Sequence, residues 1–264
     1  MGTRPRIVIT RPGRRAVPLV RAITALGAEA MPLEVMRQEV LPETQAMRSA
    51  WLDFDQFAKA VVISPFAAEC LAEALDRYWP QLPVGPHYYA VGGATAEVLH
   101  ERLGVRVHVP PTGQGDSSET LLSLPSLQAL DEQKILLVAG EGGRPLLADT
   151  LETRGARLTR LALYRRILVA PDDASAGMLA RGDFAALVVS SGEMLEHLAG
   201  WCTQATLNRT LIISSQRLAT LAGSLGFRDL RVASGATPAA LAAAVAEACD
   251  LDDADVDHDD LEKG

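Results

Sequence analysis

The chain has 264 residues, of which 48% are hydrophobic, 22% charged and 5% aromatic, and its formal net charge is −8. This length and composition predict a globular protein with an aliphatic core, more readily built as two modest domains than as one large one. No run of about 18 apolar residues is present. A chain without such a run and without a basic excess is not expected to span a membrane or to bind a membrane surface or nucleic acid.

Most of the negative charge lies at the end of the chain. Residues 250–264 carry eight carboxylates and one lysine, so residues 1–249 have a net charge of about −1. A segment this acidic and this poor in apolar residues cannot offset the entropy lost on ordering. We therefore expect 250–264 to be a disordered acidic tail.

The cysteines bear on the compartment. Cys70, Cys202 and Cys249 are far apart and odd in number, which favours a reducing cytoplasm over a disulfide framework. The first residues show no apolar stretch followed by a small-residue cleavage site, so no signal peptide is expected. The pattern predicts a cytoplasmic protein.

Short β-branched segments alternate with segments rich in alanine and leucine along the chain. The expected strands are 6–10, 60–64, 87–91, 105–109, 134–139, 185–190, 210–214 and 229–233. Among the expected helices are 66–78, 95–103 and 238–248. Most strands are apolar at consecutive positions, which is typical of sheets covered by helices on both faces. The alternation predicts an α/β fold with parallel sheets and right-handed crossovers.

The chain also contains an internal repeat. RIVIT at 6–10 aligns with KILLV at 134–138, and four more segment pairs follow in the same order. One of them matches AVVISPFAAECL with ALVVSSGEMLEHL, and another matches YYAVGGATAEVLHERLG with LIISSQRLATLAGSLG. Five matches in order indicate a duplicated βα unit, and hence two similar lobes.

Four motifs together resemble the uroporphyrinogen-III synthase family over residues 6–248: VITRPG, VGGATAEVL, GARLTRLALYRR and SGATPAALAAAV. The resemblance implies two flavodoxin-like parallel-sheet lobes with exchanged first βα units. Two extended crossing segments, at about 32–42 and 161–171, would join them. The first lobe would comprise 1–35 plus 168–249, and the second 42–164.

The resemblance implies a lyase of porphyrin and heme biosynthesis. Such an enzyme cyclises hydroxymethylbilane, a linear tetrapyrrole, with inversion of the last pyrrole ring and loss of water. It implies no cofactor, no metal, a monomer, and a transient encounter with the upstream deaminase. The substrate ionises its own hydroxymethyl group, so the protein is needed mainly for positioning and for help to the departing hydroxide.

Tyr164, in ALYRRIL, matches the tyrosine of the family in the crossing segment and is the expected catalytic residue. A phenol can donate a hydrogen bond to a leaving hydroxyl without carrying a charge at neutral pH. The alternative is a half-buried tyrosine that only covers the linker.

The substrate carries eight carboxylates, so anion sites at helix N-termini are expected to bind it. Small hydroxyl residues stand in four strand-to-helix turns, and an arginine follows the first strand. The expected substrate-binding residues are therefore Ser64, Thr95, Ser190, Ser191, Thr237 and Arg11. The alternatives are that the hydroxyl residues serve only as helix N-caps and that the arginine stays solvated.

Other interpretations of the residues are weaker. The glycines at 140–143 lack the third glycine of a dinucleotide fingerprint, and the five histidines have no metal-ligand spacing. A pair of receiver-like domains would need aspartates at strand ends, and none stands there. The remaining alternative is a two-lobed small-molecule-binding sensor without catalysis, which the sequence leaves open.

Overall fold

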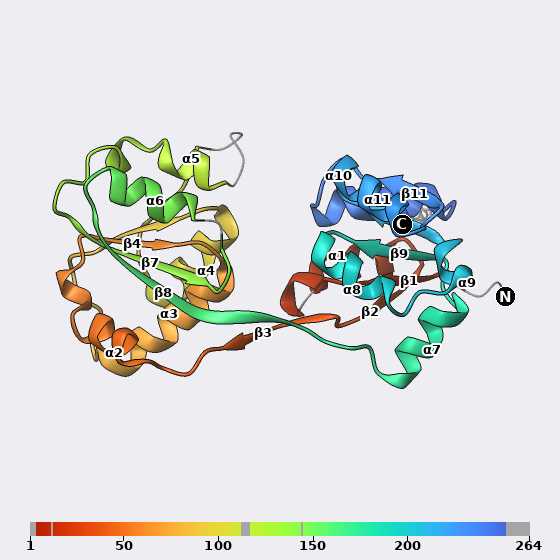
Figure 1. Ribbon diagram of the computed structural model, residues 1–264, viewed down its shortest axis with the longest axis horizontal. Helices are drawn as coiled ribbons and strands as arrows, with labels where there is room; N and C mark the ends of the chain where they lie inside the picture. Colours follow the sequence, from red (N-terminus) through yellow and green to blue (C-terminus); the bar gives the residue numbers. More distant parts are fainter. Residues whose placement is uncertain (1–3, 12, 112–116, 144, 252–264) are drawn as a thin grey trace, which may run out of the picture. The chain divides into compact units, whose positions relative to one another are not determined.

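The computed structural model describes residues 4–11, 13–111, 117–143 and 145–251 (Figure 1). Except for Asp250 and Leu251, the acidic tail expected at 250–264 lies outside these described residues. The chain divides into two compact units. Unit 1 comprises Met1–Arg37 and Ile167–Gly264, and unit 2 comprises Gln38–Arg166.

Unit 1 is built on a parallel sheet that is five-stranded within the described residues. Its strands are β1 (Arg6–Ile9), β2 (Glu29–Pro32), β9 (Ala186–Val189), β10 (Thr210–Ile213) and β11 (Asp229–Val232). Their order in the sheet is β11-β10-β9-β1-β2, and every pair is parallel. The first strand of the chain therefore lies between β2 and β9, so its neighbours come from both ends of the chain.

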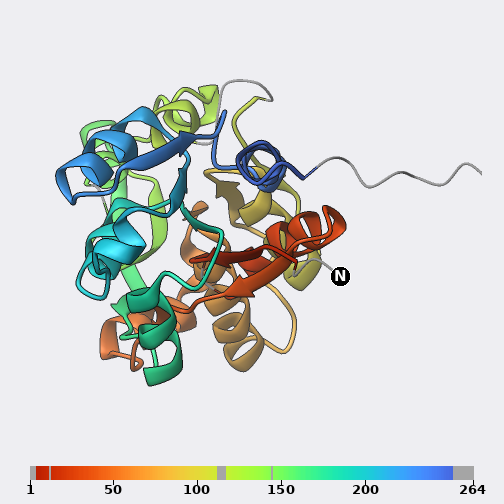
Figure 2. The ribbon, with the colours of Figure 1, turned by 90° about the vertical axis from the view of Figure 1, so that its right-hand side faces the viewer.

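Helices cover both faces of this sheet (Figure 1). They are α1 (Val17–Ala25), α7 (Asp173–Arg181), α8 (Gly192–Ala199), α9 (Gln204–Leu207), α10 (Gln216–Ser224) and α11 (Pro238–Ala248), with a 3-10 turn, η1 (Gly13–Ala16). Helices α1 and α11, from opposite ends of the chain, pack side by side on one face (Figure 2). Side chains of α7, α8 and α10 form the core on the other face.

Unit 2 is built on a second sheet, six-stranded in the part of the chain that the structure describes. Its strands are β3 (Met36–Val40), β4 (Lys59–Val62), β5 (His87–Ala90), β6 (Val107–His108), β7 (Lys134–Gly140) and β8 (Arg157–Leu168). The order is β3-β8-β7-β4-β5-β6, parallel from β8 to β6. Strand β3 runs antiparallel to β8, because Leu41 N donates to Leu163 O while Val169 N donates to Val35 O.

The sheet of unit 2 also has a core on each face. Helices α2 (Gln45–Leu52), α3 (Pro65–Tyr78) and α4 (Gly93–Leu103) pack on one face. Helices α5 (Ser118–Leu122) and α6 (Leu146–Thr153) pack on the other. Two 3-10 turns, η2 (Phe54–Gln56) and η3 (Pro125–Leu127), complete the described elements of unit 2. None of the helices in the described residues is long and apolar enough to cross a membrane.

The predicted α/β fold with parallel sheets is confirmed, and each expected strand is found, most within one residue of its expected bounds. The exception in length is 105–109, which shortens to Val107–His108 at the edge of its sheet. Sequence reasoning did not list β2, β3 or β8 as strands. Residues of β2 and β3 are mostly polar or half-exposed, so they lack the run of apolar residues that marks a covered strand.

The sequence repeat relates the two sheets strand by strand. It pairs β1 with β7, β4 with β9, and β5 with β10. The matched strands β10-β9-β1 and β5-β4-β7 are neighbours in the same order in their respective sheets.

Candidate active site

A tyrosine stands at the carboxyl edge of the unit 2 sheet. Tyr164 on β8 lies opposite Gly140, the last residue of β7, and only 7% of the tyrosine is exposed. In open α/β sheets, ligands bind outside the carboxyl ends of the strands. Tyr164 is therefore at the edge of the sheet where chemistry is expected.

The phenol of Tyr164 is paired with a serine 100 residues earlier. Its hydroxyl oxygen lies 2.9 Å from Ser64 Oγ. Ser64 follows β4 and is the N-cap of α3, where its Oγ also accepts a hydrogen bond of 3.2 Å from Ala67 N. Two residues expected from the sequence, one as catalyst and one as ligand contact, are thus brought together.

Two further residues hold the ring of Tyr164. Phe66 meets it edge-on, with ring centroids 5.0 Å apart and planes at 89°. On another side, the ring covers Gly140 so closely that a Cβ there would lie 2.6 Å from the Tyr164 Cζ. Neither residue was expected at the site. A glycine at the end of a strand is the signal that could have found Gly140, because it often marks close approach of another group.

In unit 1, the expected binding residues gather at the carboxyl ends of the parallel strands. Ser190 directly follows β9, and Ser191 is the N-cap of α8. Within the described part of the chain, the Ser191 side chain makes no capping hydrogen bond, so its hydroxyl is not used by the helix. Thr237 is the N-cap of α11, and its Oγ1 accepts from Ala240 N at 3.2 Å.

Arg11 belongs to the same edge of the unit 1 sheet. The preceding residue, Thr10, is buried and donates from its hydroxyl to Val188 O at 3.1 Å, which anchors the turn after β1. The Arg11 guanidinium donates to the carbonyl of Ala236, one residue before the Thr237 cap. The arginine therefore stands beside the N-terminus of α11, where anions are favoured.

The expectation for Thr95 as a helix cap was wrong. Helix α4 begins at Gly93 and its N-cap is Gly92, so Thr95 lies inside the first turn. The side chain is also buried, with 4% of the residue exposed. The helix begins at Gly93, two residues earlier than expected, and Gly92, a residue type that is common at N-caps, precedes it in extended backbone. The helix-cap role of Thr95 is therefore excluded, and its contact with substrate stays a prediction of the sequence.

The cysteines are unsuited to nucleophilic chemistry. Burial raises the pKa of Cys70 to about 11, and the nearby Glu73 and Glu69 act in the same direction. Burial also raises the pKa of Cys202 to about 11. Thiols of this kind are protonated at neutral pH. The described residues include no group of three or more His, Cys, Asp or Glu side chains that could hold a metal.

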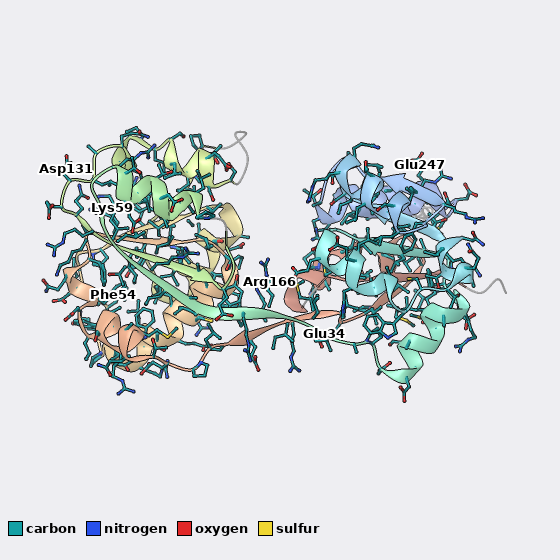
Figure 3. All side chains as sticks on the ribbon, viewed as in Figure 1. Glu34, Phe54, Lys59, Asp131, Arg166 and Glu247 are labelled. Carbon is teal, nitrogen blue, oxygen red and sulfur yellow. The ribbon has the colours of Figure 1, made fainter. Side chains whose placement is uncertain are left out.

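A cationic cluster lies at the opposite, amino-terminal ends of the unit 2 strands. Lys59 opens β4 and is 8% exposed (Figure 3). His108 on β6 stacks on Tyr89, with ring centroids 4.8 Å apart. Burial lowers the pKa of His108, and the positive charges of Arg106, His87 and Lys59 lower it further. Lys59 and His87 open β4 and β5, whereas Tyr164 lies opposite the last residue of β7, so these basic residues are not part of the candidate site.

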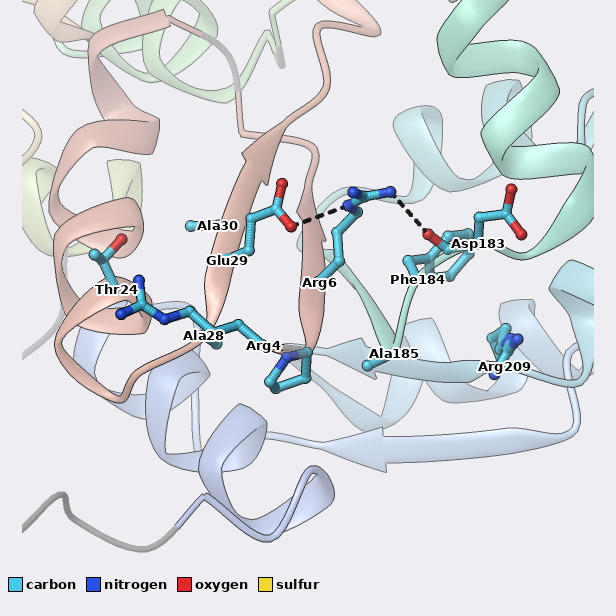
Figure 4. A pocket seen from close by; sticks show the side chains of 11 residues that line it. Arg4, Arg6, Thr24, Ala28, Glu29, Ala30, Asp183, Phe184, Ala185 and Arg209 are labelled. Atoms are coloured by element: carbon cyan, nitrogen blue, oxygen red, sulfur yellow. Dashed lines mark hydrogen bonds and ion pairs between the residues drawn. The ribbon is translucent and has the colours of Figure 1, made fainter. Parts of the chain in front are cut away.

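A hollow of about 910 Å³ lies at the amino ends of β1, β2 and β9 in unit 1 (Figure 4). Arg6 crosses it, donating to Glu29 Oε2 at 3.3 Å and to the Asp183 carbonyl at 3.4 Å. Because the hollow is at the edge opposite to Ser190, Ser191 and Arg11, it is not part of the candidate site.

Known proteins resemble this chain over nearly its whole length. The family model described as Uroporphyrinogen-III synthase HemD matches residues 17–243. A uroporphyrinogen-III synthase of Escherichia coli (strain K12) is 36% identical over 245 residues, which cover 89% of this chain and 97% of the relative. The uroporphyrinogen-III synthase of Salmonella typhimurium is 38% identical with the same coverage.

Solved structures share the fold. Uroporphyrinogen-III synthetase from Helicobacter pylori 26695 matches with a TM-score of 0.60 at 15% identity, covering 95% of this chain and all of the other. A mutant uroporphyrinogen III synthase from the extremely thermophilic bacterium Thermus thermophilus matches with a TM-score of 0.56 at 20% identity, covering 93% of this chain and 99% of the other.

Proposed function

Because this chain belongs to the uroporphyrinogen-III synthase family, we propose that Tyr164 is the residue with which it assists the departure of hydroxide from its substrate. The enzyme is a lyase of tetrapyrrole biosynthesis. It cyclises hydroxymethylbilane with inversion of the last pyrrole ring and loss of water. The non-catalytic sensor is not favoured, since the matched relatives carry the name of a synthase.

The observation that carries the proposal is the contact between Tyr164 and Ser64. A serine hydroxyl has one proton and two acceptor sites. Ala67 N occupies one acceptor site of Ser64 Oγ, and in this proposal the serine donates its own proton across the 2.9 Å contact to the phenol oxygen. The phenol then keeps its own proton for the substrate.

This direction of donation suits the chemistry. When the C–O bond of the hydroxymethyl group breaks, negative charge develops on the leaving oxygen, and a donated proton neutralises it. The phenol oxygen becomes more negative in that step, and the hydrogen bond from Ser64 stabilises it. The electrons that expel the hydroxide come from the pyrrole itself, so the protein supplies only the proton and the geometry.

We assign carboxylate binding to unit 1. Arg11, Ser190, Ser191 and Thr237 lie at the carboxyl edge of its sheet, two of them at helix N-termini. Free backbone N–H groups and the helix dipole favour anions at such places. The substrate is rich in carboxylates, which is the chemistry these positions recognise. In this proposal Ser64 acts through its hydrogen bond to the phenol of Tyr164. Direct contacts of Ser64 and Thr95 with the substrate stay predictions of the sequence.

We further propose that the units correspond to two flavodoxin-like lobes with exchanged first βα units. The lobes would comprise 1–35 plus 168–249 and 42–164, joined through 32–42 and 161–171. The common order of repeat-matched strands in the two sheets supports this proposal. A monomeric state, a cytoplasmic location and a transient encounter with the deaminase stay predictions of the sequence.

The test is Tyr164→Phe with enzymatically generated hydroxymethylbilane as substrate. We expect kcat to fall roughly 10-fold to 10³-fold, the usual scale for a positioned proton donor. The product formed on the enzyme should remain type III, because the shape of the site selects the attacking carbon. Tyr78→Phe is the matched control, since its phenol donates to Glu43 at 2.7 Å in the same unit but away from the site.

Two results would contradict the proposal. Full activity of Tyr164→Phe would show that the phenol is structural. Wild-type protein that yields only the type I isomer, at the spontaneous rate, would exclude catalysis and restore the sensor hypothesis.

A further inference from the structure

We propose that Gly140 is a positioning residue for catalysis. In this proposal, a β-bulge opposite Gly140 turns Tyr164 toward Ser64. Because glycine has no Cβ, the tyrosine ring can lie directly against the backbone at position 140. The inference rests on the role proposed for Tyr164 and identifies what aims the phenol.

The first observation is a register shift between β7 and β8. Val138 pairs with Leu161 and Ala139 with Ala162, but the next residue, Gly140, pairs with Tyr164. Leu163 is therefore an extra residue in β8, as in a β-bulge. Bulges bend the strand and re-aim side chains, and they are over-represented next to active sites.

The second observation is the face of the sheet that each side chain occupies. On β8, Leu161, Leu163 and Tyr164 all belong to the core cluster that packs against α2, α3 and α4. Strict alternation would send consecutive residues such as Leu163 and Tyr164 to opposite faces. The bulge removes this alternation at one step and brings the tyrosine to the face covered by α3.

Alternation along the two neighbouring strands places the partners on that same face. Leu136 and Val138 belong to this core cluster, so position 140, two residues further on, is directed to the same side. Ala60 and Val62 belong to it as well, and Ser64 follows in the same alternation. The ring thus lies over Gly140, and its hydroxyl reaches Ser64 Oγ at 2.9 Å.

The third observation is that only a glycine fits beneath the ring. A Cβ at position 140 would lie 2.6, 2.7 and 3.0 Å from Tyr164 Cζ, Cε2 and Cε1. Ordinary contacts of this kind begin near 3.4 Å, so an alanine would force the ring outward by about 1 Å. A misplacement of about 1 Å at a catalytic group can reduce the rate roughly 10²-fold.

The loop after β7 supplies a matched control. A Cβ added to Gly143 would meet its nearest atoms, Gly140 O and Ile63 Cδ1, at 3.9 Å. The substitution Gly143→Ala therefore fits without displacement, although it changes the same residue type three positions away. Any effect common to both variants would report on the loop, not on the ring.

The experiment compares Gly140→Ala, Gly143→Ala, Tyr164→Phe and the double variant Gly140→Ala/Tyr164→Phe as full-length proteins. We expect Gly140→Ala to lower kcat about 10-fold to 100-fold with KM changed less than about 2-fold, because the phenol acts in the chemical step. Gly143→Ala should keep wild-type values. The double variant should be no slower than Tyr164→Phe, because Gly140→Ala acts only by displacing the phenol hydroxyl, which Tyr164→Phe has already removed.

A second readout does not depend on activity. In protein labelled with ¹³C at the tyrosine ring, the signal that is lost in Tyr164→Phe identifies Tyr164. That signal should move in Gly140→Ala, while those of Tyr88 and Tyr89 stay in place. An unmoved signal would overturn the positioning role. A further large loss of kcat in the double variant would also overturn it, since Gly140 would then act without the phenol.

The two readouts separate failure of this inference from failure of the proposed function. If the Tyr164 signal moves but Gly140→Ala and Tyr164→Phe both retain full activity, the catalytic role of the phenol is wrong, and the positioning role falls with it. If Tyr164→Phe is slow and Gly140→Ala is fully active, the phenol is catalytic and only the positioning role is overturned.

Discussion

The hydrogen bond between Ser64 and Tyr164 can be measured separately from the helix cap that Ser64 also provides. Ser64→Ala removes both the 3.2 Å bond from Ala67 N and the 2.9 Å contact with the phenol. Loss of a cap of this kind costs about 1 kcal/mol of unfolding free energy. Loss of the phenol contact costs about 1 kcal/mol more, because Tyr164 is only 7% exposed.

A matched variant isolates the cap. Thr44 is the N-cap of α2 in the same unit, and its Oγ1 accepts from Met47 N at 3.2 Å. We expect Thr44→Ala to cost about 1 kcal/mol and Ser64→Ala about 2 kcal/mol. Tyr164→Phe should cost about 1 kcal/mol. The double variant Ser64→Ala/Tyr164→Phe should cost no more than Ser64→Ala, which gives a coupling of about 1 kcal/mol.

The assay is urea unfolding followed by tryptophan fluorescence. Trp51 and Trp79 lie in unit 2 and Trp201 in unit 1, so a Trp201→Phe background makes the signal report on unit 2 alone. Separate signals are needed because two units need not unfold as one transition. A coupling below about 0.3 kcal/mol, the usual scatter of additive variants, would show that the serine and the phenol do not stabilise each other.

Two further predictions concern binding and pH. Ser191→Ala and Thr237→Ala should each raise KM about 10-fold with a smaller effect on kcat, since carboxylates are bound alike in the ground and transition states. Only Thr237→Ala should also lose about 1 kcal/mol in urea unfolding, and a purely kcat effect in either variant would argue against carboxylate binding. For His108, burial and the neighbouring positive charges lower the pKa in the folded state, so the unfolded state takes up the proton first as pH falls. Its contribution to the free energy of unfolding is complete above the unfolded pKa of about 6.5 and is lost as pH falls below that value. Urea unfolding at pH 7.5 and 5.5 should therefore show a smaller loss of unfolding free energy in His108→Gln than in the wild-type protein. An equal loss in the two proteins would contradict this interpretation.

Much of the fold could be predicted because its signals are local. The expected helix 238–248 has the observed bounds Pro238–Ala248, since Thr237 and Pro238 mark its beginning and an alanine-rich run follows. Strands such as β4 and β9 show runs of apolar residues because helices cover both faces of their sheets. Strand β3 escaped detection because backbone hydrogen bonds to β8, not apolar side chains, hold it at the sheet edge.

The candidate site was predictable in part. Tyr164 was named through the family resemblance and Ser64 through the turn after a strand, and the structure places their hydroxyls 2.9 Å apart. Ser191 and Thr237 stand at helix N-caps, as the turn chemistry indicates. The prediction of Thr95 as an N-cap was wrong because the helix begins at Gly93, two residues before Thr95. The boundary of a helix depends on small differences in backbone preference that neighbouring residues can reverse.

By itself, the sequence determined the alternation of strands and helices, the family, and the kinds of side chain available for the reaction. Only the tertiary structure decided that Ser64, Gly140 and Tyr164 meet. The physical reason is that side chains alternate with a period of two along a strand, so one extra residue in a register exchanges the faces of everything beyond it. That extra residue, Leu163, is visible only once β8 is laid against β7.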